Sequence, residues 1–246
     1  MKTRSISYVG IITLTSCLSF SVIAETTSQV YVQASEGSFN NAAINQLYTK
    51  INQQRPNYVF SGTPLQTFTA AETHSAFAFT ALENSTIKGN LVQATLKAIQ
   101  EYKVTEVKAA IRTPIEMCLL RSKTDVSAKQ VLIQIASHPA ALKQIDKWKS
   151  QYNALEELSI PKGTAEAARM VATGELLSGT GAIGACMLED LYPQLVVTEK
   201  SIQDNKDNRT LFALMKLTKR DLPISEKRAN KELREVILKS EKLNID

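Results

Sequence analysis

Two kinds of hydrophobic pattern alternate along the 246-residue chain. Short apolar runs of strand length are separated by segments with helical spacing, such as Ala42, Ala43 and Leu47 after the helix-capping residue Ser38. Strands are predicted at 30–34, 77–82, 131–136, 155–160, 195–198 and 211–217, with a long extended stretch at 103–121 and a strand opening into a helix at 181–187. Helices are predicted after Ser38, at 91–99, 140–152 and 165–178, and after Ser225. This alternation is typical of an α/β domain with a mostly parallel sheet.

Short polar groups border several of these strands. Glu83-Asn84-Ser85 follows the strand at 77–82, and Ser137-His138-Pro139 follows the strand at 131–136. Asn208-Arg209-Thr210 borders the last strand. In open α/β sheets, ligands bind outside the carboxyl ends of the strands. We therefore expect a ligand site where these groups meet.

The segment from Gly179 to Gly184 matches the spacing of a dinucleotide-binding loop. That loop functions as a turn between a strand and a helix, where it brings backbone amides to a pyrophosphate. The residues before Gly179 are instead predicted to be helical. The glycines are better explained by close approach of backbone elements, so no dinucleotide site is expected.

The first 24 residues resemble a secretory leader, with Lys2 and Arg4 before an apolar stretch and a small residue, Ala24, at the end. We expect cleavage after Ala24 and a periplasmic or secreted protein. The alternative is a lipid anchor on Cys17, because Leu14-Thr15-Ser16-Cys17 resembles a lipoprotein cleavage box. This alternative ranks second because apolar residues continue past Cys17. No other segment approaches the ~20 apolar residues of a membrane span.

The positive net charge of the chain, +5, is concentrated at its ends. Two basic residues lie in the leader, and residues 216–246 hold nine Lys or Arg against six Asp or Glu. Residues 25–215 hold 18 of each sign. A nucleic-acid-binding protein gathers positive charge on its recognition surface, so a neutral body argues against that class.

Two cysteines, Cys118 and Cys186, remain after the leader. Cys118 lies in an apolar run, which favours burial as a small hydrophobic residue, while a bridge to Cys186 stays open. The chain has two histidines, His74 and His138, and no Cys/His cluster. A zinc site is therefore not expected.

Seven motifs in order resemble the catalytic domain of prephenate dehydratases. They are Glu36-Gly37-Ser38-Phe39, Glu83-Asn84-Ser85, Pro114-Ile115-Glu116-Met117-Cys118-Leu119-Leu120, Ser137-His138-Pro139-Ala140-Ala141-Leu142-Lys143-Gln144, Thr164-Ala165-Glu166-Ala167-Ala168, Gly181-Ala182-Ile183-Gly184-Ala185 and Asn208-Arg209-Thr210-Leu211-Phe212. Each motif is short, and the specificity of the resemblance comes from their order over residues 30–217.

The resemblance implies two α/β lobes with a cleft between them, similar to type II periplasmic binding proteins. Lobe one would comprise residues 25–103 and 195–218, and lobe two residues 104–194. The chain would leave lobe one near Lys103 and return near Leu195. Residues 219–246 would form a C-terminal helical tail. The family's regulatory ACT domain needs more residues than follow Phe212 here, so feedback control through such a domain is not expected.

The implied reaction converts prephenate to phenylpyruvate with loss of water and carbon dioxide, and it needs no cofactor. By the resemblance, Thr210 donates a hydrogen bond to the departing hydroxyl, with Asn84 and Ser137 as the other catalytic residues. The residues expected to bind substrate are Gln144, Glu83, Ser38, Thr164, Arg209 and Phe212. Ser38 and Thr164 would offer backbone amides at helix N-termini to the two substrate carboxylates. Prephenate and arogenate both stay open as substrates, and so does a homodimer.

Two departures from the family pattern bear on activity. Leu211 replaces the arginine of the Thr-Arg-Phe motif, and Ala140 replaces a glutamine. The alternative to an enzyme is a catalytically weak periplasmic binding protein for an aromatic keto or amino acid. Alternate strand residues share a face, so we also consider that Arg209 supplies the guanidinium missing at position 211.

Overall fold

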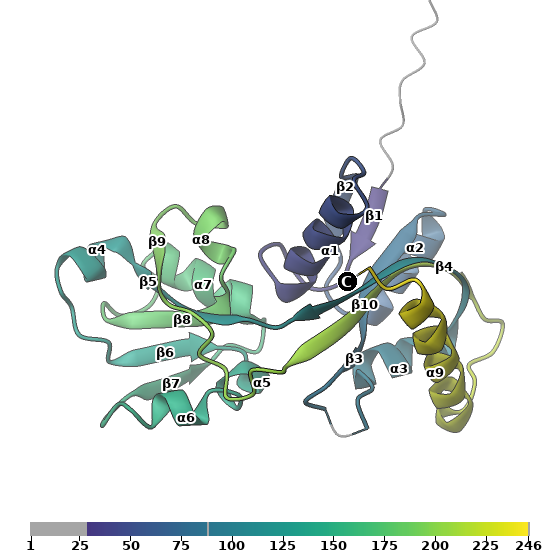
Figure 1. The fold of residues 1–246 in the computed structure, drawn as a ribbon. Helices are drawn as coiled ribbons and strands as arrows, with labels where there is room; N and C mark the ends of the chain where they lie inside the picture. Colours follow the sequence, from purple (N-terminus) through teal and green to yellow (C-terminus); the bar gives the residue numbers. More distant parts are fainter. Residues whose placement is uncertain (1–28, 88, 246) are drawn as a thin grey trace, which may run out of the picture.

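The computed structural model describes residues 29–87 and 89–245, and within them the chain forms two lobes (Figure 1). The leader, its cleavage site and Cys17 lie outside the described residues. The described strands form two five-stranded sheets, with orders β2-β1-β3-β10-β4 in lobe one and β7-β6-β8-β5-β9 in lobe two. The expected two-lobe α/β fold is confirmed.

Lobe one contains the first and the last parts of the described chain. Its elements are β1 (Gln29–Val32), α1 (Phe39–Lys50), β2 (Asn57–Phe60), α2 (Pro64–Thr73), β3 (Phe77–Asn84), α3 (Gln93–Glu101), β4 (Tyr102–Pro114), β10 (Arg209–Lys219) and α9 (Glu226–Lys242). Ser38 and Ser225 cap α1 and α9, because their side chains accept hydrogen bonds from backbone N–H groups of the first turn.

Lobe two is the middle of the chain. Its elements are β5 (Met117–Ser122), α4 (Lys123–Ser127), β6 (Gln134–Ser137), α5 (Pro139–Leu142), α6 (Asp146–Lys149), β7 (Glu156–Ser159), α7 (Thr164–Ala172), β8 (Thr180–Ala185), α8 (Leu188–Leu191) and β9 (Leu195–Glu199). The predicted helix at 140–152 is wrong, because the segment forms two short helices. The Asp204 carboxylate accepts the backbone N–H groups of Asp146 and Lys147, which starts a second helix there.

The chain passes between the lobes later than the sequence predicts. The first passage follows β4 at residues 115–116, and the second lies between β9 and β10 at residues 200–208. The expected passages near Lys103 and Leu195 are wrong, because β4 pairs with β10 from Tyr102 to Pro114 and both strands belong to lobe one.

Both sheets are mixed, so the expectation of a mostly parallel sheet is also wrong. In lobe one, β1 pairs in parallel with β2 and β3, while β10 is antiparallel to β3 and β4. In lobe two, β6 pairs in parallel with β7 and β8, while β5 is antiparallel to β8 and β9. The antiparallel pairs include the strands that flank the two passages between the lobes. The chain leaves lobe one after β4 and returns in the opposite direction along β10.

Three apolar clusters stabilise this arrangement. One is shared by both lobes and includes Ile44 of α1, Phe212 of β10 and Leu119 of β5. A second lies on the other face of the lobe-one sheet, where α9 packs residues such as Leu233 against it. The third lies within lobe two. The C-terminal helix is therefore an integral layer of lobe one rather than a separate tail.

The glycines of the rejected dinucleotide pattern lie in and before β8. A Cβ at Gly181 would approach Leu119 Cδ1 within 2.6 Å, and one at Gly184 would approach Leu188 Cδ1 within 2.6 Å. The glycines therefore allow close packing within a strand, as expected, and form no turn from a strand to a helix.

The open question about the cysteines is settled by a disulfide between Cys118 and Cys186, whose Cα atoms are 5.1 Å apart. Cys118 is fully buried among apolar residues, as predicted, and it also forms the bridge that the sequence left open. Cys118 lies opposite Gly184 on the paired strands β5 and β8, which brings Cys186 just beyond the end of β8 within reach. In the part of the chain that the structure describes, no helix has the length and apolar character to cross a membrane.

Candidate functional site

Strand pairing brings two predicted catalytic residues together. Asn84 at the end of β3 lies directly opposite Thr210 at the start of β10. The Asn84 Nδ2 group donates hydrogen bonds to Thr210 Oγ1 at 2.7 Å and to Asn208 Oδ1 at 2.8 Å. Thr210 and Asn208 are 5% and 2% exposed, so both bonds are shielded from bulk water.

The orientation of the Asn84 amide follows from its other end. Asn84 Oδ1 accepts the backbone N–H of Thr86 at 2.9 Å, and a backbone N–H can only donate. Therefore Nδ2 faces Thr210, and the Thr210 hydroxyl oxygen must act as the acceptor. Among the described residues, none accepts the Thr210 hydroxyl proton, which stays available for a ligand.

The same chain of amides reaches lobe two. Asn208 Nδ2 donates to Gln144 Oε1 at 2.7 Å, and Gln144 Nε2 donates to the Ala140 carbonyl at 2.8 Å. A carbonyl can only accept, so this end also fixes the direction of every bond. We call these three side chains, Asn84, Asn208 and Gln144, the amide chain. It links the lobes and delivers one N–H to Thr210.

A hydroxyl that accepts a hydrogen bond becomes a stronger donor, because successive hydrogen bonds polarise one another. The amide chain thus prepares Thr210 to donate to an oxygen that gains negative charge. Such a donor is what the departure of a hydroxide from a substrate requires.

Ser137 lies apart from this group. Its side chain is fully buried, and its hydroxyl donates to the Ile183 carbonyl of the neighbouring strand at 2.7 Å. His138 caps α5 by accepting the Ala140 N–H at its Nδ1 atom, at 3.2 Å. The Ser137-His138 pair therefore supports the turn that carries Gln144, and the structure does not bring Ser137 to Thr210.

The two helix N-termini expected to bind carboxylates differ in their free donors. The Ser38 N–H already donates to the Ser35 carbonyl at 3.2 Å, and the Ser38 side chain caps α1. In contrast, α7 begins at Thr164 after Gly163, which provides no side-chain cap. The first turn of α7 is therefore the better anion site of the two.

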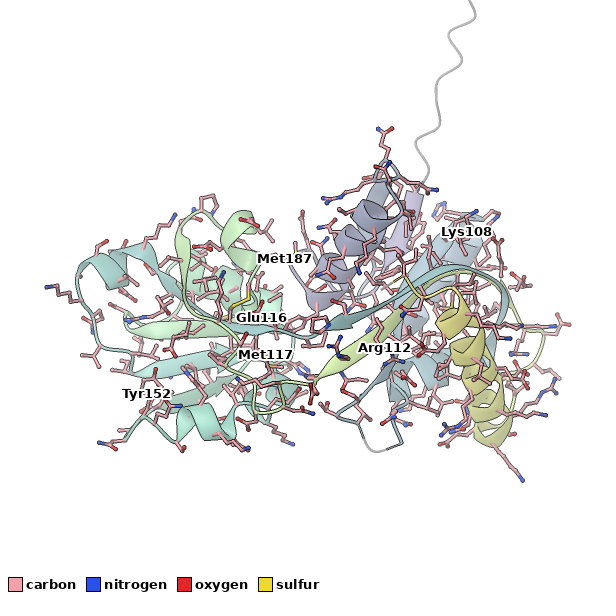
Figure 2. The ribbon with its side chains drawn as sticks, in the orientation of Figure 1. Lys108, Arg112, Glu116, Met117, Tyr152 and Met187 are labelled. Atoms are coloured by element: carbon pink, nitrogen blue, oxygen red, sulfur yellow. A yellow bond between two sulfur atoms is a disulfide. The ribbon has the colours of Figure 1, made fainter. Side chains whose placement is uncertain are left out.

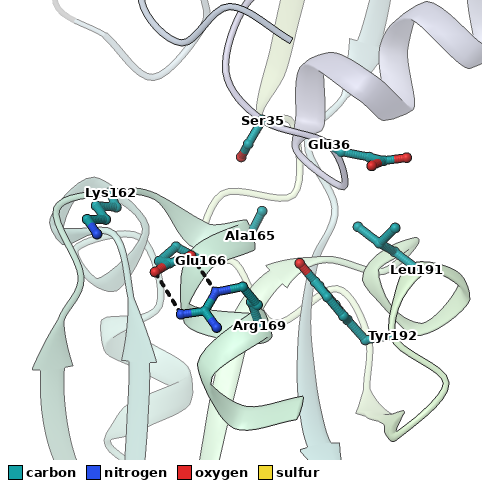
Figure 3. Close-up of a pocket in the computed structure, with 8 residues that line it drawn as sticks. All are labelled: Ser35, Glu36, Lys162, Ala165, Glu166, Arg169, Leu191 and Tyr192. Atoms are coloured by element: carbon teal, nitrogen blue, oxygen red, sulfur yellow. Dashed lines mark hydrogen bonds and ion pairs between the residues drawn. The ribbon is translucent and has the colours of Figure 1, made fainter. Parts of the chain in front are cut away.

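A pocket of about 520 Å³ opens between the lobes next to these helix starts. Figure 3 shows Tyr192 of lobe two pointing toward the lobe-one loop that carries Ser35 and Glu36. The remaining lining residues are Lys162, Ala165, Glu166, Arg169 and Leu191. The pocket adjoins the N-termini of α1 and α7 in sequence, and its lining includes no member of the amide chain.

Arg169 forms the electrostatic centre of the pocket wall. Its guanidinium binds both carboxylate oxygens of Glu166 and both of Glu175, at 2.6–3.0 Å. The hydrogen bonds from Arg169 lower the pKa of Glu175 to about 2. The guanidinium of Arg169 is already bound to two carboxylates. Lys162, the other cation in the pocket lining, is therefore better placed to bind an anionic ligand.

The remaining predicted residues lie on the two faces of β10. Phe212 is buried on the same face as Thr210 and stacks on Phe79 with ring centroids 5.6 Å apart. Leu211 is fully buried on the opposite face. Arg209 shares that opposite face and is exposed, so the geometry does not favour a role for Arg209 at Thr210.

Glu83, one of the residues expected to bind substrate, has a charged partner on a neighbouring strand that the sequence did not reveal. Its carboxylate forms an ion pair with Arg112 of β4. Asn208 and Arg112 were both missed as site residues. Asn208 stood within a family motif and could have been found there, whereas the Arg112 contact depends on strand register. Within the described residues, no group of three or more His, Cys, Asp or Glu could hold a metal ion.

The sequence model of the prephenate dehydratase family matches residues 30–220. The chain belongs to the prephenate dehydratase family. A search of curated protein sequences found no match.

Solved structures agree with the family assignment at the level of the fold. A prephenate dehydratase from Arthrobacter aurescens, solved with L-Phe, has a TM-score of 0.63 and 21% identity over 80% of this chain and 62% of its own. The enzyme from Staphylococcus aureus has a TM-score of 0.56 and 20% identity, covering 76% of this chain and 66% of its own. A third, GqqA, described as a novel type of quorum quenching acylase, has a TM-score of 0.58 and 21% identity, covering 80% and 66%.

The present chain thus spans slightly less than two thirds of these proteins. Identities near 20% establish the shared two-lobe fold and leave the activity to be argued from the site.

Proposed function

We propose that this protein is a prephenate dehydratase that converts prephenate to phenylpyruvate. Family membership supports the reaction class, and the Asn84–Thr210 geometry supports the chemistry. The single observation that carries the proposal is the buried Thr210 hydroxyl, which accepts from Asn84 and keeps its proton free for the substrate.

In the proposed reaction, the bond between the ring carbon and its carboxylate breaks and carbon dioxide leaves. The electron pair of that bond enters the ring, and the bond between the opposite ring carbon and its hydroxyl breaks. Thr210 donates a hydrogen bond to the departing hydroxide, which takes up a proton and leaves as water. Aromatisation supplies the driving force. The protein's part is to place one donor where negative charge develops.

Substrate carboxylates would bind at the uncapped first turn of α7, with Lys162 nearby in the pocket wall. Backbone N–H groups at a helix N-terminus favour anions because their dipoles point at the ligand. This assignment keeps Thr164 as a binding residue and gives Ser38 a structural role.

We further propose that the mature protein acts outside the cytoplasm after removal of residues 1–24. The Cys118–Cys186 disulfide supports this location, because such bridges persist in oxidising compartments. Mass spectrometry of the protein isolated from its cell envelope tests the proposal. A chain starting at Glu25 is expected, and a lipid on Cys17 would show the anchor reading to be right instead.

The competing function is a binding protein for an aromatic keto or amino acid, favoured by the absence of an arginine at Leu211. Incubation of purified protein with prephenate, while phenylpyruvate is followed by absorbance, separates the two. We expect turnover well above the spontaneous rate. If turnover does not exceed that rate while prephenate still binds, the binding-protein function is correct. Arogenate in a parallel assay decides the substrate.

A further inference from the structure

Arg112 lies one strand away from the position where the family motif has its arginine. Leu211 of β10 pairs with Glu83 of β3 on one side and with Arg112 of β4 on the other. Directly opposed residues of neighbouring strands point to the same face. Glu83, Leu211 and Arg112 therefore form a row across the sheet, on the face opposite to Thr210.

The guanidinium of Arg112 spans this row. Its Nη2 atom donates to Glu83 Oε1 and also to Glu241 Oε1 near the end of α9. The Arg112 backbone N–H donates to Asn244 Oδ1 at 2.7 Å, so the residues after α9 hold the main chain as well. Figure 2 places Arg112 beside β10, where the long strands leave lobe one.

Glu83 immediately precedes Asn84, and the two side chains point to opposite faces of β3. A fixed Glu83 side chain restrains the rotation of the strand end about its own axis. The same rotation would move the Asn84 amide away from Thr210. Arg112 thus acts on the catalytic face through the residue next to Asn84.

We propose that Arg112 is a positioning residue, which supplies from β4 the guanidinium missing at Leu211 and holds Asn84 against Thr210. Through the contact of Glu241 with Arg112, the C-terminal helix also takes part in this positioning. The proposal rests on the proposed function as far as catalysis is concerned. The three charged side chains are 17–38% exposed, so solvent screens their attraction and the stability effect of breaking it is small.

The test compares Arg112→Leu, Arg112→Lys and Glu241→Gln with Lys108→Leu, a control that removes an exposed cation from the same strand. We expect Arg112→Leu to lower kcat about tenfold with KM nearly unchanged, because small misplacements of catalytic groups cost up to ~100-fold. On a logarithmic scale, Glu241→Gln should lower kcat by about half as much as Arg112→Leu does. Arg112→Lys should recover only part of the loss, because an ammonium group on a flexible stem is less preorganised than the planar guanidinium.

The sharpest variant is the exchange of the two positions, Arg112→Leu with Leu211→Arg. Position 211 lies directly opposite Glu83, so the double variant returns a guanidinium to that carboxylate and should restore kcat relative to Arg112→Leu. If the exchange leaves kcat as low as in Arg112→Leu, or if Arg112→Leu equals Lys108→Leu, the positioning role is wrong.

A readout that does not depend on turnover separates this proposal from the proposed function. Hydrogen exchange of the peptide covering residues 83–90 should accelerate in Arg112→Leu, while the urea midpoint of unfolding stays near that of Lys108→Leu. Unchanged exchange there overturns the positioning role even in an active enzyme. If the wild-type protein has no dehydratase activity, the proposed function is wrong. The hydrogen-exchange result would still decide whether Arg112 holds the end of β3 at Asn84.

Discussion

The two lobes contribute unequally to the candidate site. Lobe one provides Thr210 and Asn84 from paired strands, and Asn208 precedes β10 directly. Of the residues that the sequence predicted in lobe two, Gln144 alone joins them, while Ser137 supports the lobe-two sheet. We infer that lobe one carries the chemistry and that lobe two helps to hold the substrate.

The largest effect is expected at Thr210. Thr210→Ala removes the donor to the departing hydroxide and should lower kcat by about 10²–10³-fold, the usual cost of one oxyanion donor. Thr210→Ser, which keeps the hydroxyl, is the matched control and should lose much less. Steady-state kinetics with prephenate measures both. Equal activity of the Ala and Ser variants would remove Thr210 from the mechanism.

The disulfide of lobe two should matter for stability and not for chemistry. The double variant Cys118→Ala/Cys186→Ala should lower the free energy of unfolding by about 2–4 kcal/mol, because the unfolded chain regains the freedom of the open loop. Urea denaturation measures this loss. Since the bridge lies within lobe two, kcat of the folded fraction should not change. A large fall in kcat would contradict the division between the lobes.

The link between the lobes should have an intermediate effect. Gln144→Ala leaves Asn208 Nδ2 without its acceptor, which costs about 1–3 kcal/mol when the group stays buried. Because Asn84 still donates to Thr210, we expect KM to rise more than kcat falls. The reverse pattern in a kinetic comparison with wild type would show that Gln144 belongs to the chemical machinery.

The smallest effect concerns pH and the pocket wall. Arg169 holds the pKa of Glu175 near 2, below its ordinary value of 4.5. A lowered folded-state pKa stabilises the protein above the unfolded value, and this contribution is lost as pH falls from about 4.5 toward 2. The difference in stability between pH 7 and pH 3 should therefore be slightly smaller in Glu175→Gln than in the wild-type protein. Urea midpoints of unfolding at the two pH values measure this difference. If Glu175→Gln lowers stability at pH 7 by more than the wild-type protein loses between pH 7 and pH 3, the role given to the Arg169–Glu175 pair is wrong.

The sequence predicted the features that depend on residues close to one another in the chain. It predicted the Ser38 and Ser225 helix caps, most strands, and the motif residues Asn84 and Thr210. It missed β2 and α2, whose segment has weak apolar spacing and is stabilised by a capping box between Thr63 and Gln66.

Long-range register could not be read in the same way. Arg112 looks like an ordinary charged strand residue until the pairing of β4 with β10 places it beside Leu211 and within reach of Glu83. The disulfide likewise depends on the antiparallel pairing of β5 with β8. On the basis of this register we propose Arg112, rather than Arg209, as the guanidinium that compensates for Leu211.

The central claim is that Asn84 donates to Thr210 and so directs the Thr210 proton toward the substrate. Asn84→Asp tests this claim most directly, because a carboxylate keeps the bond from the Thr86 N–H but accepts the Thr210 proton instead of donating. We predict at least a ~10-fold fall in kcat of the folded protein for prephenate, because the hydroxyl loses its role as a donor. The urea midpoint should also fall, because Asn208 Oδ1 then faces a carboxylate instead of a donor. A variant that turns over prephenate as fast as wild type would contradict the account.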